Sequence, residues 1–214
     1  MLSIRFLTIF SFIFTLGFNF NAFAQDETVS DGRLGIEEII VTGTKRDISQ
    51  QDVPIAVSTI TEQQLENTFR NDVFALGQLA PNVTLTPQNG FNAIAGGMRG
   101  TGFISILVTK DPSVGIVVDD FAFNHVQAQA IEMFDMEQVE IYRGPQGTLF
   151  GKNTTGGAIA FTTKKPVLGE TTFDVEATYG QYASNDASIE KINAAINFPI
   201  GDKLAVRISV IQDE

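Results

Sequence analysis

The sequence predicts an α+β domain of short strands and short helices, followed by the first antiparallel strands of a transmembrane β-barrel. Three observations lead to this prediction. Glycine-rich loops separate short β-branched segments between residues 36 and 166. Two segments with helix-start signals interrupt these strands between residues 61 and 80. After Pro166, apolar and polar residues alternate along three segments, which is the period of strands with one polar and one apolar face.

The first 24 residues differ in kind from the rest of the chain. Arg5 is their only charged residue, residues 6–20 are almost wholly apolar, and Ala22 and Ala24 have the spacing that signal peptidase requires. We expect a secretory signal peptide at residues 1–24. A membrane anchor is the alternative, but the apolar run is shorter than the roughly 20 residues that span a bilayer.

Composition excludes several classes of function. The formal net charge is -11 at pH 7, and an acidic surface argues against nucleic acid as a partner. The chain has no cysteine, so disulfides give no indication of its compartment. A single histidine excludes a dense histidine-based metal site, and we expect neither a metal nor a cofactor.

The segment that follows residues 25–35 contains a β-branched cluster. Ile39, Ile40, Val41 and Thr42 lie between polar flanks, preceded by Glu37 and Glu38. On the residues alone, an ordinary edge strand is the simplest interpretation.

Residues 53–81 predict a strand and two short helices. The strand covers Val53–Ile60, with Pro54 near its start. Thr61-Glu62-Gln63-Gln64 is a capping box, and Ile60 with Leu65 can form the hydrophobic staple across it. A second helix is predicted from Asp72 until Pro81 stops it. This pattern indicates core packing.

The run from Glu137 to Pro166 is the most informative part of the sequence. A strand containing Val139 and Ile141 enters a loop with glycines at 144, 147, 151, 156 and 157, and a second strand, 158–162, leaves it. So much glycine predicts tight turns or close approach of backbone segments.

The same region fails the tests for phosphate chemistry. A phosphate loop ending in Gly151-Lys152 would need glycine where Gln146 stands and Ser or Thr where Asn153 stands. Asp119 and Asp120, neighbours after a predicted strand at 114–118, are better explained as a turn or strand-end cap than as an acid/base pair. We find no set of nucleophile, base and orienting group, so we expect no enzyme.

Three strands are predicted near 173–179, 191–198 and 204–210, with a short turn at 200–203 and a longer loop at 180–188. This asymmetry fits the periplasmic turns and extracellular loops of outer-membrane barrels. A soluble sheet with one wet face would show the same alternation. Three strands cannot close a barrel, so we expect the chain to be an N-terminal fragment.

Residues 36–166 resemble the plug domain of TonB-dependent outer-membrane receptors. The resemblance comes from a set in order: the helix pair, the Arg99-Gly100 turn, the Val-rich strand ending at Asp119, and the segment Glu140-Ile141-Tyr142-Arg143-Gly144-Pro145 with Gly151, Gly156 and Gly157. It implies a small mixed sheet with short helices. The implied divisions are a signal peptide at 1–24, an N-terminal extension at 25–47, the plug at 48–166 and the start of the barrel at 167–214.

The resemblance also implies roles for particular residues. Glu38, Ile39, Ile40, Val41 and Thr42 would be the energy-coupling box that TonB captures by strand addition. Arg99 and Arg143 would pair with carboxylates of the barrel wall beyond Glu214 and lock the plug in place. Apical residues would face the ligand, and candidates are Phe91, Phe121, Phe123 and His125.

The implied function is import of a scarce ligand, most commonly a ferric siderophore or other metal complex, across the outer membrane of a Gram-negative bacterium. The partners would be TonB with its energising inner-membrane complex, outer-membrane lipid and a small-molecule or metal-chelate ligand. Two other classes of function remain to be compared: a soluble secreted binding module without transport, and an enzyme that handles phosphate or nucleotides on its glycine loops.

Overall fold

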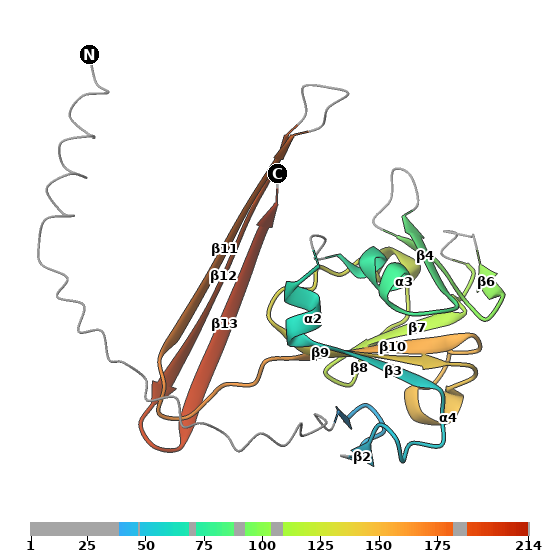
Figure 1. Cartoon of the computed structure of the whole chain (residues 1–214), viewed down its shortest axis with the longest axis horizontal. Coiled ribbons are helices and arrows are strands. Elements are labelled where there is room, and N and C mark those ends of the chain that lie inside the picture. The colour runs from blue at the N-terminus through green and yellow to red at the C-terminus, as the bar shows by residue number, and fades with distance from the viewer. Residues whose placement is uncertain are drawn as a thin grey trace, which may run out of the picture. The chain divides into compact units, whose positions relative to one another are not determined.

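The computed structural model describes residues 39–46, 48–68, 72–87, 93–103, 109–181 and 188–213, and the predicted signal peptide lies outside them. The elements of this part of the chain are shown in Figure 1 and have the following bounds: β1 Ile40–Val41, β2 Ile48–Ser49, β3 Val57–Thr61, α2 Glu62–Glu66, the 3-10 helix η1 Val73–Ala75, α3 Leu76–Leu79, β4 Val83–Pro87, β5 Ile94–Met98, β6 Thr101–Phe103, β7 Val114–Val118, β8 Phe121–Phe123, the 3-10 helix η2 Val126–Ala128, β9 Met136–Arg143, α4 Gly147–Phe150, β10 Gly157–Thr163, β11 Thr172–Gln181, β12 Ser188–Ile200 and β13 Leu204–Asp213.

A five-stranded mixed sheet forms the centre of the α+β domain. Its strand order is β3-β9-β10-β7-β8, in which only β10 and β7 run parallel. The middle strands β9 and β10 pair from Gly157 opposite Arg143 to Thr163 opposite Met136. The glycine-rich loop predicted from the sequence therefore connects the two central neighbours of the sheet.

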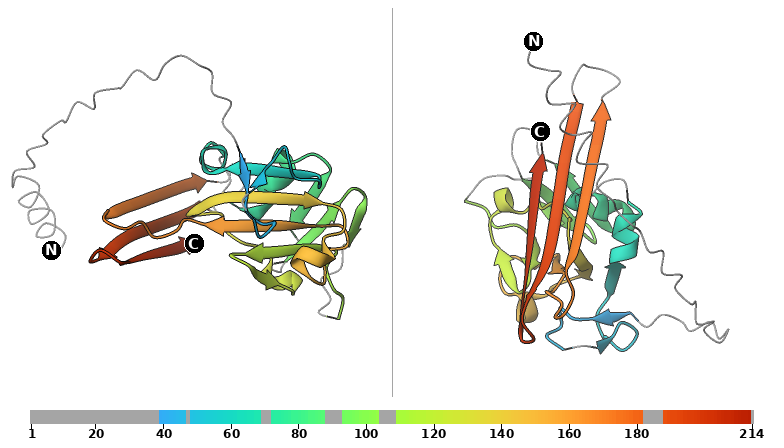
Figure 2. Two further views of the ribbon diagram at one scale, coloured as in Figure 1. Left: turned by 90° about the horizontal axis from the view of Figure 1, so that it is seen from below. Right: turned by 90° about the vertical axis from the view of Figure 1, so that its left-hand side faces the viewer.

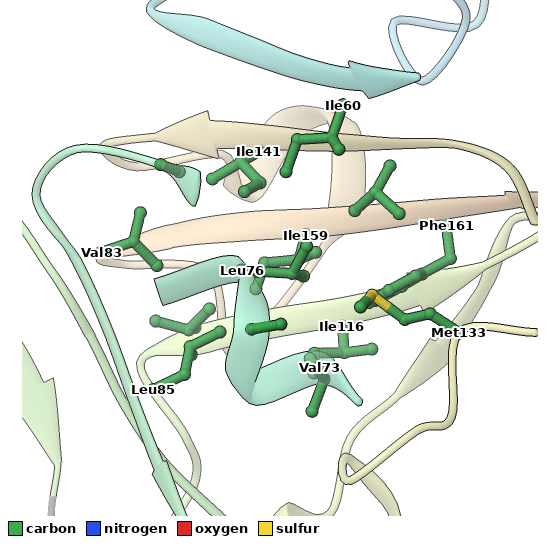
Figure 3. Packing of buried hydrophobic residues seen from close by; sticks show 14 of the residues in the cluster. Ile60, Val73, Leu76, Val83, Leu85, Ile116, Met133, Ile141, Ile159 and Phe161 are labelled. Atoms are coloured by element: carbon green, nitrogen blue, oxygen red, sulfur yellow. The ribbon is translucent and has the colours of Figure 1, made fainter. Parts of the chain in front are cut away.

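The main hydrophobic core lies between this sheet and the helical segment before β4. Figure 3 shows residues converging from the 3-10 helix, α3, the sheet and β4. Leu76, Val73 and Ile159 are completely buried in this cluster. A smaller cluster around Tyr142, Phe150 and Val41 includes residues of β9, α4 and β1. Removing either cluster would leave the sheet unsupported, because burial of apolar surface is the main stabilising term.

Three strands, β4-β5-β6, form a separate antiparallel sheet in which glycines face one another. Gly97 lies opposite Gly102, and a Cβ atom on Gly97 would come within 3.1 Å of the Cα of Gly102. Small residues are thus required for this backbone contact. The turn between β5 and β6 contains Arg99, whose φ is 52°.

The last three strands form an antiparallel sheet of order β11-β12-β13, seen as long neighbouring strands in Figure 2. The turn Gly201–Lys203 joins β12 to β13. The alternation of apolar and polar residues along these three segments predicted the three strands correctly. Among the described residues, no helix has both the length and the hydropathy needed to cross a membrane.

Most other elements agree with the sequence predictions. The first helix begins after Thr61, and Gln64 Oε1 accepts the backbone N–H of Thr61 at 3.2 Å, as the capping box requires. The second helical segment begins after Asp72, whose side chain accepts from the N–H of Ala75. The strand predicted at Val53–Ile60 is wrong at its start, because β3 begins at Val57. Pro54 cannot donate a ladder hydrogen bond, which explains the late start.

Candidate functional site

The carboxylate of Glu140, on the central strand β9, binds the N-terminal segment of the described chain. Glu140 is 0% exposed. Its Oε1 accepts the backbone N–H of Thr42 at 2.5 Å, and its Oε2 accepts the N–H of Gly43 at 2.7 Å. Two side chains complete the set: Gln138 Nε2 donates at 2.9 Å and the Tyr142 hydroxyl donates at 2.8 Å. Within the described residues these donors are all neutral, so hydrogen bonds stabilise this buried charge.

Strand β1 continues this attachment toward the N-terminus. Ile40 pairs with Ser49 and Val41 pairs with Ile48 of β2. Val41 is fully buried in the smaller core cluster, whereas Ile40 is 48% exposed. The edge strand predicted for this segment is therefore present, but only two residues long. Of the five residues predicted as a coupling box, Ile39–Thr42 are described and Glu38 lies outside the described residues.

Tyr142 joins the Glu140 site to the smaller core. Burial, then the charge of Glu140 and their hydrogen bond, raises the pKa of the Tyr142 hydroxyl above its ordinary value. The hydroxyl thus remains a neutral donor to the carboxylate. The ring of Tyr142 lies 5.0 Å from that of Phe150, centroid to centroid. The contact with Phe150 holds the Tyr142 side chain in the position from which its hydroxyl donates to Glu140.

Gly43→Ala is expected to weaken the attachment of the N-terminal segment. A Cβ atom at this position would collide with Glu140 Oε2 and would lie 2.8 Å from the Tyr142 hydroxyl. Overpacking of this kind costs about 1–3 kcal/mol. Hydrogen exchange of the Val41 and Thr42 amides should therefore accelerate in the purified protein. Gly147→Ala is the matched control, because a Cβ there meets nothing within 4 Å, and unchanged exchange in Gly43→Ala would contradict the expectation.

The glycines of the sequence motif serve the two purposes predicted for them. Gly144 and Gly151 have φ values of 102° and 79°, which favour glycine. Gly156 and Gly157 are sites of close approach: a Cβ on Gly156 would lie 2.6 Å from Thr101 Oγ1, and one on Gly157 would collide with the carbonyl of Tyr142. Pro145 is exposed beside Gly144. These positions are structural and shape the β9–β10 loop.

The two arginines predicted to lock the domain have different surroundings. Arg143 Nη2 donates to Ser58 Oγ at 2.9 Å and thereby joins β9 to β3. Its Nε is buried and has no hydrogen-bond partner among the described residues. The side chain of Arg99 comes near Gly144, where a Cβ would lie 3.3 Å from Arg99 Nη1. The carboxylates predicted for the lock would lie beyond Glu214, so the lock stays a prediction.

The predicted ligand-facing residues are dispersed. Phe91 lies outside the described residues. Phe121 is 78% exposed, Phe123 packs partly against the main core, and His125 is exposed before the 3-10 helix η2. Phe121 follows Asp120, whose carboxylate pairs with Lys45 of the N-terminal segment. The ligand role of all four residues stays a prediction.

Asp119 confirms the interpretation of the Asp119-Asp120 pair as a turn with a strand-end cap. Asp119 and Asp120 have φ values of 45° and 73° in the turn between β7 and β8. Asp119 Oδ1 accepts the N–H of Thr163 at 3.0 Å, and Oδ2 accepts its hydroxyl at 2.7 Å. The carboxylate therefore caps the end of β10.

Sequence reasoning missed a charged cluster that joins the domain to the last strands. Asp135, directly before β9, accepts from Arg207 of β13 and from Ser209. Burial would raise the pKa of Asp135, but hydrogen bonds from Arg207 and Ser209 and the nearby positive charges outweigh it, so the pKa is lowered. One sequence feature could have indicated this contact. Arg207 is a cation on the polar face of the third predicted strand.

Comparisons with known proteins agree with this fold. The family described as "TonB-dependent Receptor Plug Domain" matches residues 49–158. The iron-regulated outer membrane virulence protein of Vibrio cholerae is 27% identical over 205 residues, which are 91% of this chain and 30% of that protein. The ferrioxamine B receptor of Salmonella typhimurium is 26% identical over 173 residues, covering 79% of this chain and 23% of the receptor.

A solved structure gives the same result for the fold. The ferric yersiniabactin uptake receptor from Yersinia pestis superposes with a TM-score of 0.60 at 22% identity, covering 73% of this chain and 24% of that structure. The chain therefore spans less than a third of the length of these relatives.

Proposed function

Because this chain belongs to the TonB-dependent receptor plug domain family, we propose that it forms the plug and first wall strands of a receptor that imports a scarce ligand across the outer membrane. The plug fills the lumen of the barrel, ligand binds at the outer face, and the N-terminal segment transmits energy supplied through TonB. Transport, with no chemical conversion of the ligand, is the activity this arrangement supports.

The observation that carries this proposal is the polarity of the sheet β11-β12-β13. Along β12 the polar Asn193 and Asn197 are 4% and 0% exposed, whereas Ile192 and Phe198 are 57% and 54% exposed. The exposed apolar side chains continue on both neighbours: Phe173, Val175 and Tyr179 on β11, and Val206, Ile208 and Val210 on β13. A water-soluble sheet buries its apolar side chains, so the inverse arrangement favours a lipid-facing wall over a soluble binding module.

The exposed apolar side chains form a continuous surface. Phe173 lies opposite Ile196, which lies opposite Ile208 on the next strand. On the polar face, Asn197 accepts the N–H of Val167 at 3.0 Å and donates to the carbonyls of Val167 and Glu170. These contacts fix the linker between β10 and β11 to the wall. We therefore assign residues 167–214 to the start of the barrel.

The N-terminal segment has the properties of a coupling element. It is attached through one two-residue strand and through Glu140, and the carbonyl of Ile39, the next residue toward the N-terminus, accepts the backbone N–H of Gln50. Release of this small set of contacts would free a β-branched strand for capture by TonB through strand addition. Ile39–Thr42 and the preceding Glu38 would then be the coupling box.

An iron chelate is the ligand class that the relatives favour. The Salmonella protein is named a ferrioxamine B receptor, and the Yersinia structure is that of a ferric yersiniabactin uptake receptor. We extend that class to this chain and place the receptor in the outer membrane of a Gram-negative bacterium. Radioiron-labelled ferrioxamine B and a ferric catecholate are suitable first probes, and failure of one of them to bind would exclude that chelate as the ligand.

Ile40→Pro is expected to abolish uptake by the receptor that carries this chain and to spare ligand binding. Proline removes a backbone donor from the segment proposed to act by strand addition. Ile40 is half-exposed and lies outside both hydrophobic core clusters, so the plug should stay folded. Radioiron accumulation and equilibrium binding to whole cells measure the two properties separately.

Ile40→Val is the control, because it keeps the backbone donor and the β-branched side chain. It should transport at close to the rate of the unchanged receptor. Loss of binding in parallel with uptake in Ile40→Pro would show that the segment is structural. Undiminished uptake would exclude this segment as the coupling box.

A further inference from the structure

Asp135 and Arg207 form a partly buried, multiply hydrogen-bonded ion pair between the plug and β13. Their side chains are 7% and 8% exposed. Arg207 Nη2 lies 2.5 Å from Asp135 Oδ1, and Nε lies 2.9 Å from Oδ2, so the guanidinium binds the carboxylate through two donors. The pairing spans 72 residues of sequence. Such a pair requires both groups to be held in place, since a buried charge without its partner is costly.

Neighbouring groups hold both members of the pair. Ser209 Oγ donates to Asp135, and Arg207 Nη2 also donates to Asp174 of β11 at 2.9 Å. Arg207 Nη1 lies 3.4 Å from Thr172 Oγ1. Ser209, Asp174 and Thr172 all lie on β11 or β13. The contact therefore fixes the loop that precedes β9, called the plug loop below, to two wall strands.

The backbone of Asp135 joins the same contact to the centre of the plug sheet. Its φ is 61°, a conformation that residues other than glycine seldom adopt. Its carbonyl accepts the N–H of Lys164 at 3.0 Å. Lys164 directly follows β10, and Asp135 directly precedes β9. One residue therefore ties together the wall, the start of β9 and the end of β10.

A second ion pair also joins a carboxylate of the plug to a cation of the wall. Lys191 of β12 lies 3.0 Å from Glu132, which belongs to the same plug loop as Asp135. A cavity of about 300 Å³, lined by residues that include Met133, Asp135 and Asp174, lies beside these contacts. Apolar side chains therefore do not fill the space between the plug loop and the wall at this point. The two ion pairs connect the plug to the wall there.

We propose that the Asp135–Arg207 pair is a positioning anchor. It holds the start of β9 and the end of β10 to the wall while the N-terminal segment is pulled. This inference rests on the proposed function in one respect, the pull by TonB. The charges of this anchor are placed the other way round from those of the predicted lock. Here the plug supplies the carboxylates and the wall supplies the cations. Asp135 directly precedes β9 and Glu140 lies in the middle of the same strand, so β9 connects the coupling segment to the wall.

The test is a double-mutant cycle on the complete receptor, with Asp135→Asn, Arg207→Met and the combination. Hydrogen exchange of the amides near Lys164 and at the start of β9 should accelerate at least ten-fold in each single variant, and the combined variant should differ little from either one. Exchange of Thr42 and Gly43 should stay unchanged without TonB. Asp202→Asn, in the exposed β12–β13 turn, is the matched control.

A readout of plug retention completes the test. Cells carrying Asp135→Asn should become more sensitive to vancomycin, whose entry reports an opened lumen, while ferrioxamine B or ferric catecholate binding measured on the same cells reports the proposed function independently. Should Asp135→Asn fail to reach the membrane, Arg207→Lys supplies the measurement, since it keeps the charge but loses the two-donor geometry. Additive effects in the cycle, or unchanged exchange in Arg207→Lys, would overturn the anchor.

Discussion

Glu140→Gln is expected to detach the segment Ile40–Gly43 from the plug while leaving the central sheet intact. The carboxylate accepts two backbone N–H groups and two side-chain donors, and it is completely buried. A glutamine amide has one accepting oxygen, so its NH₂ group would face donors, and at least one backbone N–H would lose its acceptor. A buried unsatisfied group costs about 1–3 kcal/mol, and more where a charged group had been its partner.

The measurement is hydrogen exchange of the Thr42 and Gly43 amides, which should accelerate about 100-fold for a loss of roughly 3 kcal/mol. Binding of the TonB C-terminal domain to receptor without ligand should strengthen, because the segment is no longer held. Glu137→Gln is the control, since Glu137 lies on the same strand and is exposed. Exchange that is equally slow in both variants would show that the Glu140 charge does not hold the segment.

Arg143→Ala is expected to have the second large effect, because it removes a partly buried cation from the middle of the plug. Arg143 donates to Ser58 Oγ across the β3–β9 pair, and its buried Nε has no hydrogen-bond partner among the described residues. Pairing with a wall carboxylate, as the family resemblance implies, would satisfy that donor. Removing one partner of a desolvated ion pair costs about 3–5 kcal/mol.

The plug of Arg143→Ala should therefore loosen, which faster hydrogen exchange in β9 and greater antibiotic permeability would report. Lys152→Ala is the control, because the Lys152 side chain is 66% exposed. Unchanged exchange and permeability in the combined Arg99→Ala, Arg143→Ala variant would show that these arginines do not hold the plug.

Local sequence signals predicted those elements whose structure depends on neighbours in the chain. The Val-rich segment 114–118 is a strand with the predicted bounds, because β-branched residues suit a buried pleated surface. The capping box placed the start of α2 correctly, since its bonds join residues only three positions apart. Alternation predicted β11, β12 and β13 because each strand repeats one simple period.

The contacts of the candidate site could not be predicted in the same way. Glu140 was recognised only as part of a motif, and its bond to Thr42 joins residues 98 positions apart. The Asp135–Arg207 pair depends on how the first wall strands meet the plug loop, which no local pattern encodes. The late start of β3 follows from Pro54, which has no backbone N–H to donate to a neighbouring strand.

The shortness of β1 has a mechanical consequence. Its two residues pair antiparallel with β2, and the bond from the Gln50 N–H to the Ile39 carbonyl closes the open end of this hairpin. A tension applied before Ile39 would load these bonds one after another, as in unzipping, and never all together, as in shearing. Such a hairpin yields at low force and re-forms quickly. Under the proposed pull, the hairpin would open at its N-terminal end and re-form afterwards, while the central sheet stays intact.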